Sequence, residues 1–326
     1  MEHELSHKVV IVNTGGTIAM NLDETTNSVQ VGLSHPLRSI EAVLRRVASY
    51  EMVDLFNVPS PHMTPVMMHE LSRVIRKYLE QPDVLGVVVT HGTDTLEETA
   101  YYLDLTIRGD KPVVITGAMR SSNELGADGP VNLVQSLRVA EHESSRGRGV
   151  LVVFNDEIHA ARHVTKTHTS NVATFQSPSY GPVGIVTKKD ISYHQPPDRV
   201  DVFEPQVPQA QVPVVKMVAG MDPKWLQFLF DAAIDGVVLE AFGAGNVSPP
   251  VLSVLRKLRE KAIPVVMVSR CYNGYVQDIY GYEGGGKQLK DLGIVFCNGL
   301  NGQKARIRLM VLLAAGVPAD QFSNYF

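Results

Sequence analysis

The hydrophobic residues of the chain are concentrated in short runs that end in small or polar residues, and amphipathic segments separate these runs. In the first half the apolar runs are KVVIVNTGG from Lys8, GVVVTHGTDT from Gly86, KPVVITGAM from Lys111 and GVLVVFND from Gly149. Continuous apolar strands of this kind are typical of a parallel sheet covered on both faces. Helical patterns lie between them, over residues 36–50, 65–80, 95–108 and 130–141. The alternation predicts a doubly wound, mostly parallel α/β domain.

A proline-rich stretch separates this half from the next. Residues 194–213, HQPPDRVDVFEPQVPQAQVP, have neither helical nor strand periodicity, and we interpret them as an interdomain linker. Apolar runs resume beyond it in GVVLEAFGAGN, IPVVMVSRCYNG and GIVFCNGL. We therefore predict a larger N-terminal domain over 1–193 and a smaller C-terminal α/β domain over 214–326.

Composition and charge limit the classes of function. The 326 residues are 44% hydrophobic and 20% charged, as in ordinary globular proteins, so disorder and a fibrous repeat are not expected. A net charge of −4 and a pI near 6.3 provide no basic field for phosphate backbones, so nucleic acid is not expected as a partner. No apolar run approaches the roughly 20 residues of a membrane span, so no membrane association is expected either.

The N-terminal residues and the cysteines indicate the compartment. The first 20 residues, MEHELSHKVVIVNTGGTIAM, lack the basic region, long apolar core and small-residue cleavage site of a secretion signal. Cys271 and Cys297 are too few for a disulfide framework or a zinc site, and we interpret both as buried thiols, with a single disulfide left open. We expect a cytoplasmic protein.

The first apolar run ends in a turn that carries two hydroxyl groups. Thr14 and Thr17 flank two glycines, which allow the backbone to approach a ligand closely. A nucleophile here would be exposed and well fixed. The turn taken alone is equally typical of threonines that cap backbone groups, and no Gly-Lys-Ser/Thr of a phosphate loop follows it.

The run from Gly86 ends in His91, Gly92, Thr93, Asp94 and Thr95, ahead of a predicted helix. Thr93 or Asp94 would be a suitable cap for that helix. Adjacent side chains on an extended or turning backbone point apart, which would let Thr93 face a reacting carbonyl while Asp94 holds a cationic amino group. His91 is a weaker candidate for a general base, because a lone histidine is often structural.

Lys166 lies in the hydroxyl-rich segment RHVTKTHTSN, where a lysine is normally a solvated surface charge. Burial beside Thr93 would instead favour its neutral amine, which accepts a proton. Composition does not decide between these two states.

Five segments together resemble the bacterial-type L-asparaginase family, which includes glutaminase-asparaginases. They are TGGTIA at 14–19, THGTDTLEETAYYLDLT at 90–106, TGAMR at 116–120, ADGPVNL at 127–133 and VTKTHT at 164–169. The similarity continues through the second domain to QKARIRLMVLL, so it covers nearly the whole chain. Two well-separated hydroxyl motifs in the expected order make it specific.

The resemblance implies a role for each matching residue. Thr17 corresponds to the nucleophilic threonine of the family, and Thr93, Asp94 and Lys166 to the second threonine, its adjacent aspartate and its lysine partner. Ser60 corresponds to the serine that binds the substrate carboxylate. Asn246 corresponds to an asparagine that reaches a neighbouring subunit's site, which implies a homotetramer of paired dimers. No metal or organic cofactor is implied.

The chain departs from the family in two places. The family usually has a tyrosine in the loop after the first motif, but residues 20–34 contain none. Pro61 and His62 follow the substrate-binding serine, where the family often has glutamine and aspartate. A partner-subunit glutamate near the substrate amino group has no clear counterpart in this chain, and the candidates for its position are Tyr280 and Glu283.

The resemblance implies an amidohydrolase that hydrolyses L-asparagine to L-aspartate and ammonia through an acyl-enzyme on Thr17. Backbone N–H groups near Thr93 and Ala118 would stabilise the oxyanion. Three alternatives stay open: mixed asparaginase and glutaminase specificity, an ammonia-supplying subunit of tRNA-dependent amidation, and a non-catalytic asparagine sensor. The amidation subunit would carry a long extra N-terminal domain, and a sensor would not be expected to retain all four candidate catalytic residues.

Overall fold

The computed structural model describes residues 7–23, 28–31, 40–198 and 201–326. The chain divides into two compact units, Met1–Val202 and Phe203–Phe326. In the part of the chain that the structure describes, no helix has the length and apolar character needed to cross a membrane.

The first unit contains an eight-stranded mixed sheet in the order β12-β11-β8-β7-β6-β5-β1-β4. Its strands are β1 Lys8–Gly15, β4 Tyr50–Val58, β5 Val84–Thr90, β6 Val113–Thr116, β7 Val150–Phe154, β8 Glu157–Ala160, β11 Gly184–Val186 and β12 Ile191–Tyr193. The five strands from β4 to β7 in this order are parallel, and β8, β11 and β12 extend the sheet in antiparallel pairing.

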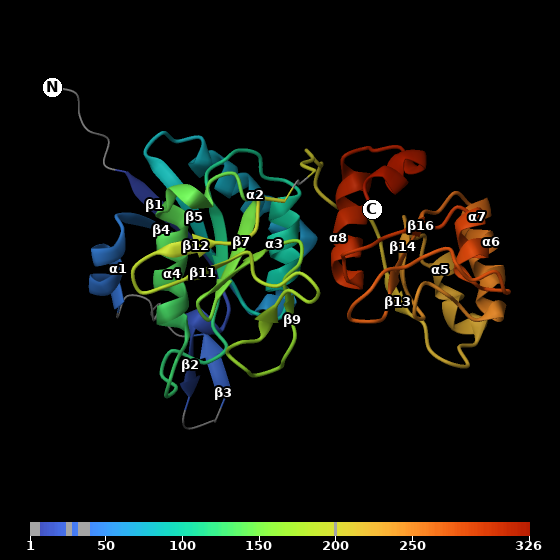
Figure 1. Cartoon of the computed structure of the whole chain (residues 1–326), viewed down its shortest axis with the longest axis horizontal. Coiled ribbons are helices and arrows are strands. Elements are labelled where there is room, and N and C mark those ends of the chain that lie inside the picture. The colour runs from blue at the N-terminus through green and yellow to red at the C-terminus, as the bar shows by residue number, and fades with distance from the viewer. Residues whose placement is uncertain (1–6, 24–27, 32–39, 199–200) are drawn as a thin grey trace. The chain divides into compact units, whose positions relative to one another are not determined.

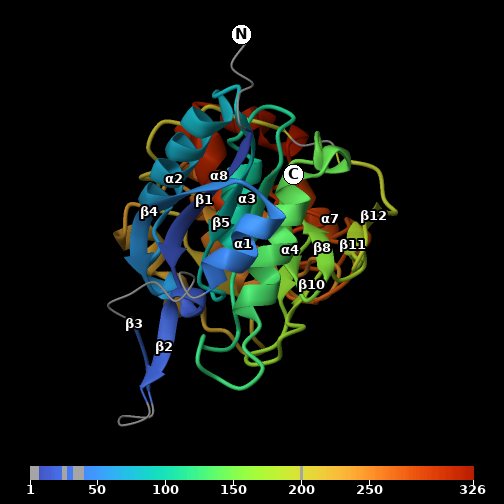
Figure 2. The same cartoon turned by 90° about the vertical axis from the view of Figure 1, so that its left-hand side faces the viewer.

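Helices cover both faces of this sheet, as the continuous apolar runs predict. The helices are α1 Glu41–Val47, α2 Pro65–Leu79, α3 Leu96–Asp104 and α4 Gly129–Glu141. Alternate side chains of β1 point into two separate cores: Val9 and Ile11 pack with α1 and α4, whereas Val10 and Val12 pack with α2 and α3. Figure 2 shows α1 and α4 together on one face of the sheet. The predicted doubly wound domain is confirmed.

Two short antiparallel pairs lie outside the main sheet, within the described residues. One joins β2 Met20–Asp23 to β3 Ser28–Val31, and the other joins β9 Thr165–Lys166 to β10 Phe175–Gln176. Figure 1 labels β2, β3 and β9 of these pairs. The segment β9 carries the candidate residue Lys166, so its attachment to the rest of the unit is functionally important.

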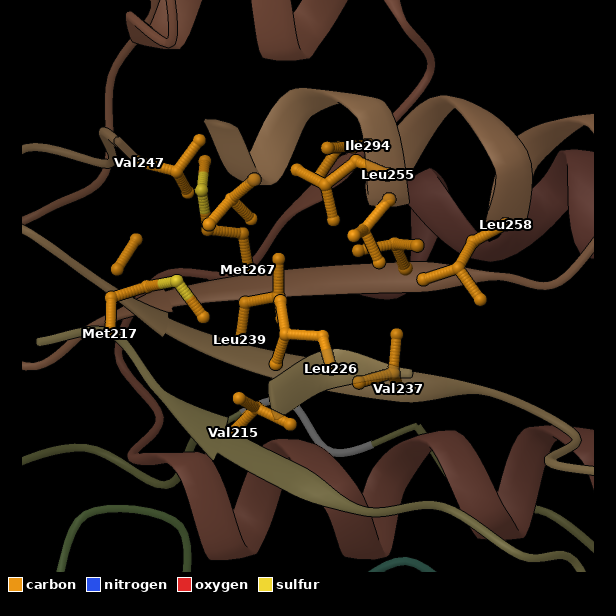
Figure 3. Close-up of a cluster of buried hydrophobic side chains, with 14 of the residues drawn as sticks. Val215, Met217, Leu226, Val237, Leu239, Val247, Leu255, Leu258, Met267 and Ile294 are labelled. Atoms are coloured by element: carbon orange, nitrogen blue, oxygen red, sulfur yellow. The ribbon is translucent and has the colours of Figure 1, made fainter. Parts of the chain in front are cut away.

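The second unit is a smaller α/β domain built on an all-parallel sheet in the order β13-β14-β15-β16. Its strands are β13 Val214–Lys216, β14 Val237–Ala241, β15 Val265–Ser269 and β16 Val295–Phe296. Its helices are α5 Phe228–Asp231, α6 Leu252–Glu260, α7 Gly286–Asp291 and α8 Gly302–Ala314. Figure 3 shows the apolar cluster on one face, in which Leu239 and Met267 of the sheet pack with Leu255 of α6. Leu309 of α8 packs on the opposite face, against Val266.

The predicted linker, 194–213, contains neither helix nor strand among its described residues. Its second part packs on the C-terminal unit: Phe203, Ala210 and Val212 join the core that α8 covers. The ring of Phe203 makes an edge contact with Tyr325, at 5.3 Å between centroids. The first part of the predicted linker is instead bound to the first unit, where Gln195 Nε2 donates to the carbonyl of Tyr180 at 2.8 Å.

Two sequence-based expectations are wrong in detail. The helix predicted over 36–50 is α1, Glu41–Val47, and Tyr50 begins strand β4; residues 36–39 lie outside the described part of the chain. Cys271 is exposed and not a buried thiol, because it lies in the irregular segment after β15; Cys297 is buried, and neither cysteine forms a disulfide.

Candidate active site

The candidate residues of the first unit lie at the point where the strand order reverses. Strand β1 pairs with β4 on one side and with β5 on the other. In doubly wound sheets, ligands bind outside the carboxyl ends of the strands at such a switch point. Thr17 follows β1, and Thr93 follows β5. The topology alone therefore brings the two hydroxyl motifs together.

Close backbone contact fixes the loops that carry these motifs. Gly16, at φ +84°, packs against Gly92. A Cβ atom on Gly92 would lie 3.1 Å from Gly16 Cα and 2.7 Å from Ser60 Cβ, so neither contact leaves space for a side chain. Three segments distant in sequence therefore meet at Gly92, which contacts the backbone of Gly16 and the side chain of Ser60, and each segment carries a candidate residue at or beside the contact.

The two threonines of the first turn have different surroundings. Thr14 is buried, and its hydroxyl donates to the carbonyl of Thr90 at 2.8 Å. Thr17 begins a 3₁₀ turn, Thr17–Ala19, and is partly exposed. Its hydroxyl has no hydrogen-bond partner among the residues that the structure describes. Thr14 therefore has a structural role, and Thr17 is the hydroxyl available for chemistry.

Lys166 joins the second motif through its side chain. Its Nζ donates to Thr93 Oγ1 at 2.8 Å and to Asp94 Oδ1 at 2.7 Å, and its side chain is 16% exposed. The expectation that Thr93 and Asp94 point apart is wrong for these two oxygen atoms, because the chain turns after β5 and both face one ammonium group. Lys166 is not a solvated surface charge.

The Thr93–Asp94 turn is also tied to Ser60. The backbone N–H of Asp94 donates to Ser60 Oγ at 3.1 Å, and the hydroxyl of Thr95 donates to the carbonyl of Ser60 at 2.8 Å. Ser60 is buried, whereas the Asp94 side chain is 59% exposed. A ligand can therefore approach the Asp94 carboxylate from solvent.

His91 is a structural member of this turn. It is fully buried, with Nδ1 2.7 Å from the carbonyl of Gly92 and Nε2 2.9 Å from Thr99 Oγ1. A carbonyl can only accept, so Nδ1 carries the proton and Nε2 accepts from the Thr99 hydroxyl. Burial lowers the pKa of His91 from 6.5 to about 4, which keeps the ring neutral. Both ring nitrogens are therefore occupied in holding the turn, and neither is available as a general base.

The loop after β6, which carries Ala118, is held by two residues that the sequence analysis did not select. Asp128 accepts from the backbone N–H of Met119 and Arg120, at 2.9–3.1 Å. Asn132 Nδ2 donates to the carbonyl of Gly117 at 3.0 Å. Both belong to the ADGPVNL segment, whose helix-starting Asp and Pro were the available signal.

Glu97 is a third residue that the sequence analysis did not select for the site. It lies in the first turn of α3, is buried, and accepts from Thr165 Oγ1 at 2.9 Å and from the backbone N–H of Lys166 at 3.3 Å. An acidic residue in a first helical turn is usually explained by the helix dipole, so its sequence position gave no distinct signal.

The remaining candidates belong to the second unit. Asn246 is partly folded into its own loop: its Oδ1 accepts from the N–H of Gly286 at 3.2 Å, and its backbone pairs with Phe242. Tyr280 is 42% exposed, with its ring 5.4 Å from that of Tyr282, and Glu283 is exposed as well. These residues lie on surface-facing loops of the unit.

Comparison with known proteins identifies the family of the chain. Residues 8–199 match the family model "Asparaginase, N-terminal", and residues 211–326 match "Glutaminase/Asparaginase C-terminal domain". The chain is 36% identical over 323 residues to a probable L-asparaginase of Deinococcus radiodurans, covering 98% of this chain and 97% of the relative. It is 35% identical over 331 residues to L-asparaginase 2 of Escherichia coli, covering 98% and 92%.

A solved structure is similar over the same length. The crystal structure of a probable cytoplasmic L-asparaginase from Campylobacter jejuni superposes with a TM-score of 0.86 at 30% identity, covering 98% of each chain. The chain belongs to the asparaginase family and is an amidohydrolase.

Proposed function

We propose that the protein hydrolyses L-asparagine to L-aspartate and ammonia through a covalent acyl-enzyme on Thr17. The observation that carries this proposal is the contact of Lys166 Nζ with Thr93 Oγ1, at 2.8 Å, beside the loop that presents Thr17. Thr93, Asp94 and Lys166 are hydrogen-bonded to one another at the switch point of the sheet, and Gly16, the residue before Thr17, packs against Gly92, the residue before Thr93. Such a set is suited to acyl transfer.

The proposed reaction has two steps. In the first, Thr17 Oγ1 bonds to the side-chain amide carbon, the C–N bond breaks, and the hydroxyl proton leaves with the nitrogen as ammonia. In the second, water attacks the ester carbon, the bond to Thr17 Oγ1 breaks, and the hydroxyl is restored. Thr93 and Lys166 position the water and carry its proton. Division of the reaction in this way replaces one difficult amide cleavage with two easier steps.

The groups around the hydroxyls suit an amino acid substrate. Asp94 is more than half exposed and would bind the α-amino group, while Ser60 would bind the α-carboxylate. Backbone N–H groups near Thr93 and Ala118 would stabilise the oxyanion. Asn246 of a second copy of the chain would complete the pocket in a homotetramer of paired dimers.

The test is the rate of ammonia release from L-asparagine, D-asparagine, L-glutamine and D-glutamine, measured in parallel. L-asparagine should be turned over fastest, and Thr17→Ala should abolish the signal. One methylene separates the two amides, and a difference of that size in a pocket is worth about 1 to 3 kcal/mol, so a 10- to 200-fold preference is expected. Equal rates with both L-amides would refute the substrate assignment, and an active Thr17→Ala variant would refute the nucleophile.

A further inference from the structure

Lys166 lies in strand β9, which is not part of the main sheet. Strand β9 is two residues long and, among the described strands, pairs only with β10. The pairing places Lys166 opposite Phe175, whose ring packs against Phe154 at 4.5 Å between centroids. This contact anchors β10 in the core, but it leaves the position of Lys166 relative to Thr93 to other interactions.

One carboxylate oxygen provides such an interaction. Glu97 Oε1 accepts from Thr165 Oγ1 at 2.9 Å and from the N–H of Lys166 at 3.3 Å. Both donors belong to β9, which lies beside α3 (Figure 1). Thr165 and Glu97 are 9% and 4% exposed, so water competes little for these hydrogen bonds.

The helix that carries Glu97 directly follows the turn that carries Thr93 and Asp94. Only Thr95 and Leu96 separate Asp94 from Glu97, and Leu96 and Glu97 lie in the first turn of α3, so the distance between Glu97 and this turn is fixed. Lys166 is therefore bound at two points to one continuous segment: its backbone to Glu97 in α3, and its Nζ to Thr93 and Asp94 in the turn before α3.

We infer that Glu97, acting through Thr165, is a positioning residue that sets the backbone of Lys166 at the distance from which its ammonium group reaches Thr93. This inference rests on the proposed role of Lys166 in proton transfer. Glu97 accepts from the Thr165 hydroxyl and from the backbone N–H of Lys166, so it acts on the position of the Lys166 backbone. A displacement of about 1 Å in a catalytic group can cost about a hundredfold in rate.

The primary test is Thr165→Val, which keeps the branched shape and deletes the hydroxyl. We expect kcat to fall about tenfold to a hundredfold, with KM within about threefold of the wild type, because substrate-binding groups are untouched. Thr165→Ser restores the hydroxyl and should recover most of kcat. Glu97→Leu should lower kcat as Thr165→Val does, whereas Glu97→Gln keeps an acceptor oxygen and should retain more activity.

The chain offers a matched control two residues away. Thr167 follows Lys166 in the chain, and its hydroxyl donates to the carbonyl of Thr174 at 2.8 Å, next to the β9–β10 pair. Thr167→Val deletes an equal group without touching α3, so its kcat should stay near that of the wild type. An equal loss of kcat in Thr165→Val and Thr167→Val would overturn the positioning role.

A combination with Lys166→Met separates this inference from the proposed function. If Thr165 acts through Lys166, Thr165→Val should add less than about a twofold loss in the Lys166→Met background. Wild-type turnover in Lys166→Met alone would refute the proposed function of the lysine. An inactive Lys166→Met together with a fully active Thr165→Val would refute only the positioning role, as would a Thr165→Val protein that melts earlier but has unchanged kcat.

Discussion

Acid destabilisation through His91 can be calculated from the structure. The ring is fully buried, donates from Nδ1 to the Gly92 carbonyl and accepts at Nε2 from Thr99. A proton added at Nε2 would replace an acceptor with a donor and would place a charge in the core. The pKa of His91 is therefore lowered to about 4 in the folded chain, while the unfolded chain keeps the ordinary value of 6.5.

The sign and size of the effect follow from these two pKa values. The unfolded chain takes up a proton as the pH falls through 6.5, but the folded chain does so only near 4, so stability is complete above 6.5 and falls between 6.5 and 4. At about 1.36 kcal/mol per pKa unit, His91 alone lowers the free energy of unfolding by about 2 kcal/mol at pH 5 and about 3 kcal/mol at pH 4.

The assay compares the wild type with His91→Asn, whose side chain can still donate but does not titrate. Trp225 is the single tryptophan and lies in the second unit, so its fluorescence does not report on this site. Hydrogen exchange of the β5 amides, Val84–Thr90, reports on the first unit, which contains His91. The measured rates are corrected for the intrinsic pH dependence of amide exchange. The pKa of His69 is also lowered, chiefly by burial. His69 is present in both proteins, so its effect on the pH dependence of stability cancels in the comparison.

The variant is expected to be less stable than the wild type at pH 7.5, because the bond to Thr99 is lost, but to have a flatter pH profile. The difference in opening free energy between the two proteins should therefore shrink by about 2 kcal/mol from pH 7.5 to pH 5. Parallel profiles for wild type and His91→Asn would refute the assignment of a buried, neutral ring.

Four further predictions concern the proposed reaction and its assembly. Thr17→Ala and Thr93→Val should each remove nearly all ammonia release while far-UV circular dichroism stays unchanged, and wild-type turnover in either would contradict that residue's role. Lys166→Met should lower kcat with little change in KM; a large rise in KM at constant kcat would instead assign Lys166 to substrate binding. Subunit exchange between inactive Thr17→Ala and inactive Asn246→Ala proteins should restore part of the activity, and no recovery after exchange verified by mass would count against a shared site. Residues 20–34 lack the loop tyrosine of the family, and we predict that Tyr280 of a second copy of the chain activates Thr17 in its place. Tyr280→Phe should then lower kcat about tenfold to a thousandfold with assembly intact, and an unchanged kcat would exclude this role.

The central strands could be predicted because burial on both faces leaves a simple pattern. Strands β1, β5, β6 and β7 are nearly all buried and coincide with the predicted runs. Strand β4 was not predicted, because it is the edge strand of the sheet and mixes Glu51, Asp54 and Asn57 with apolar residues. Its periodicity is weak, since none of its residues is fully buried.

The antiparallel strands and the helices of the second unit were also missed for physical reasons. Strands β8, β11 and β12 have only three or four residues each, too few to establish a period. Helix α8 buries side chains on nearly all sides, including Lys304 and Arg308, so its sequence lacks the polar stripe of a surface helix. In these elements the burial that determines the pattern depends on tertiary packing.

The same distinction applies to the candidate site. A motif indicates which residue types are present, and the family resemblance assigned roles to Thr17, Thr93 and Lys166. A physical reason to prefer Thr17 over Thr14 comes only from the structure, in which the Thr14 hydroxyl donates to the Thr90 carbonyl. Likewise the tautomer of His91 depends on a partner eight residues further along the chain, in α3. Hydrogen bonds between distant segments are invisible in a single sequence.

The glycines explain why the site tolerates so little change in its backbone. Gly92 contacts Gly16 and Ser60 so closely that an added Cβ atom would lie 3.1 Å from Gly16 Cα and 2.8 Å from Ser60 Oγ. Three interactions therefore fix the turn that presents Thr93: the contact of Gly92 with Gly16, the hydrogen bonds of the buried His91 ring, and the start of α3 directly after the turn. A rigid turn of this kind holds its hydroxyl in the reactive position, so no reorganisation free energy is needed at the moment of reaction. The lysine, by contrast, comes from a two-residue strand outside the sheet, and its placement depends on a few hydrogen bonds. Catalysis should therefore be most sensitive, outside the reacting groups themselves, to changes that loosen β9 from α3.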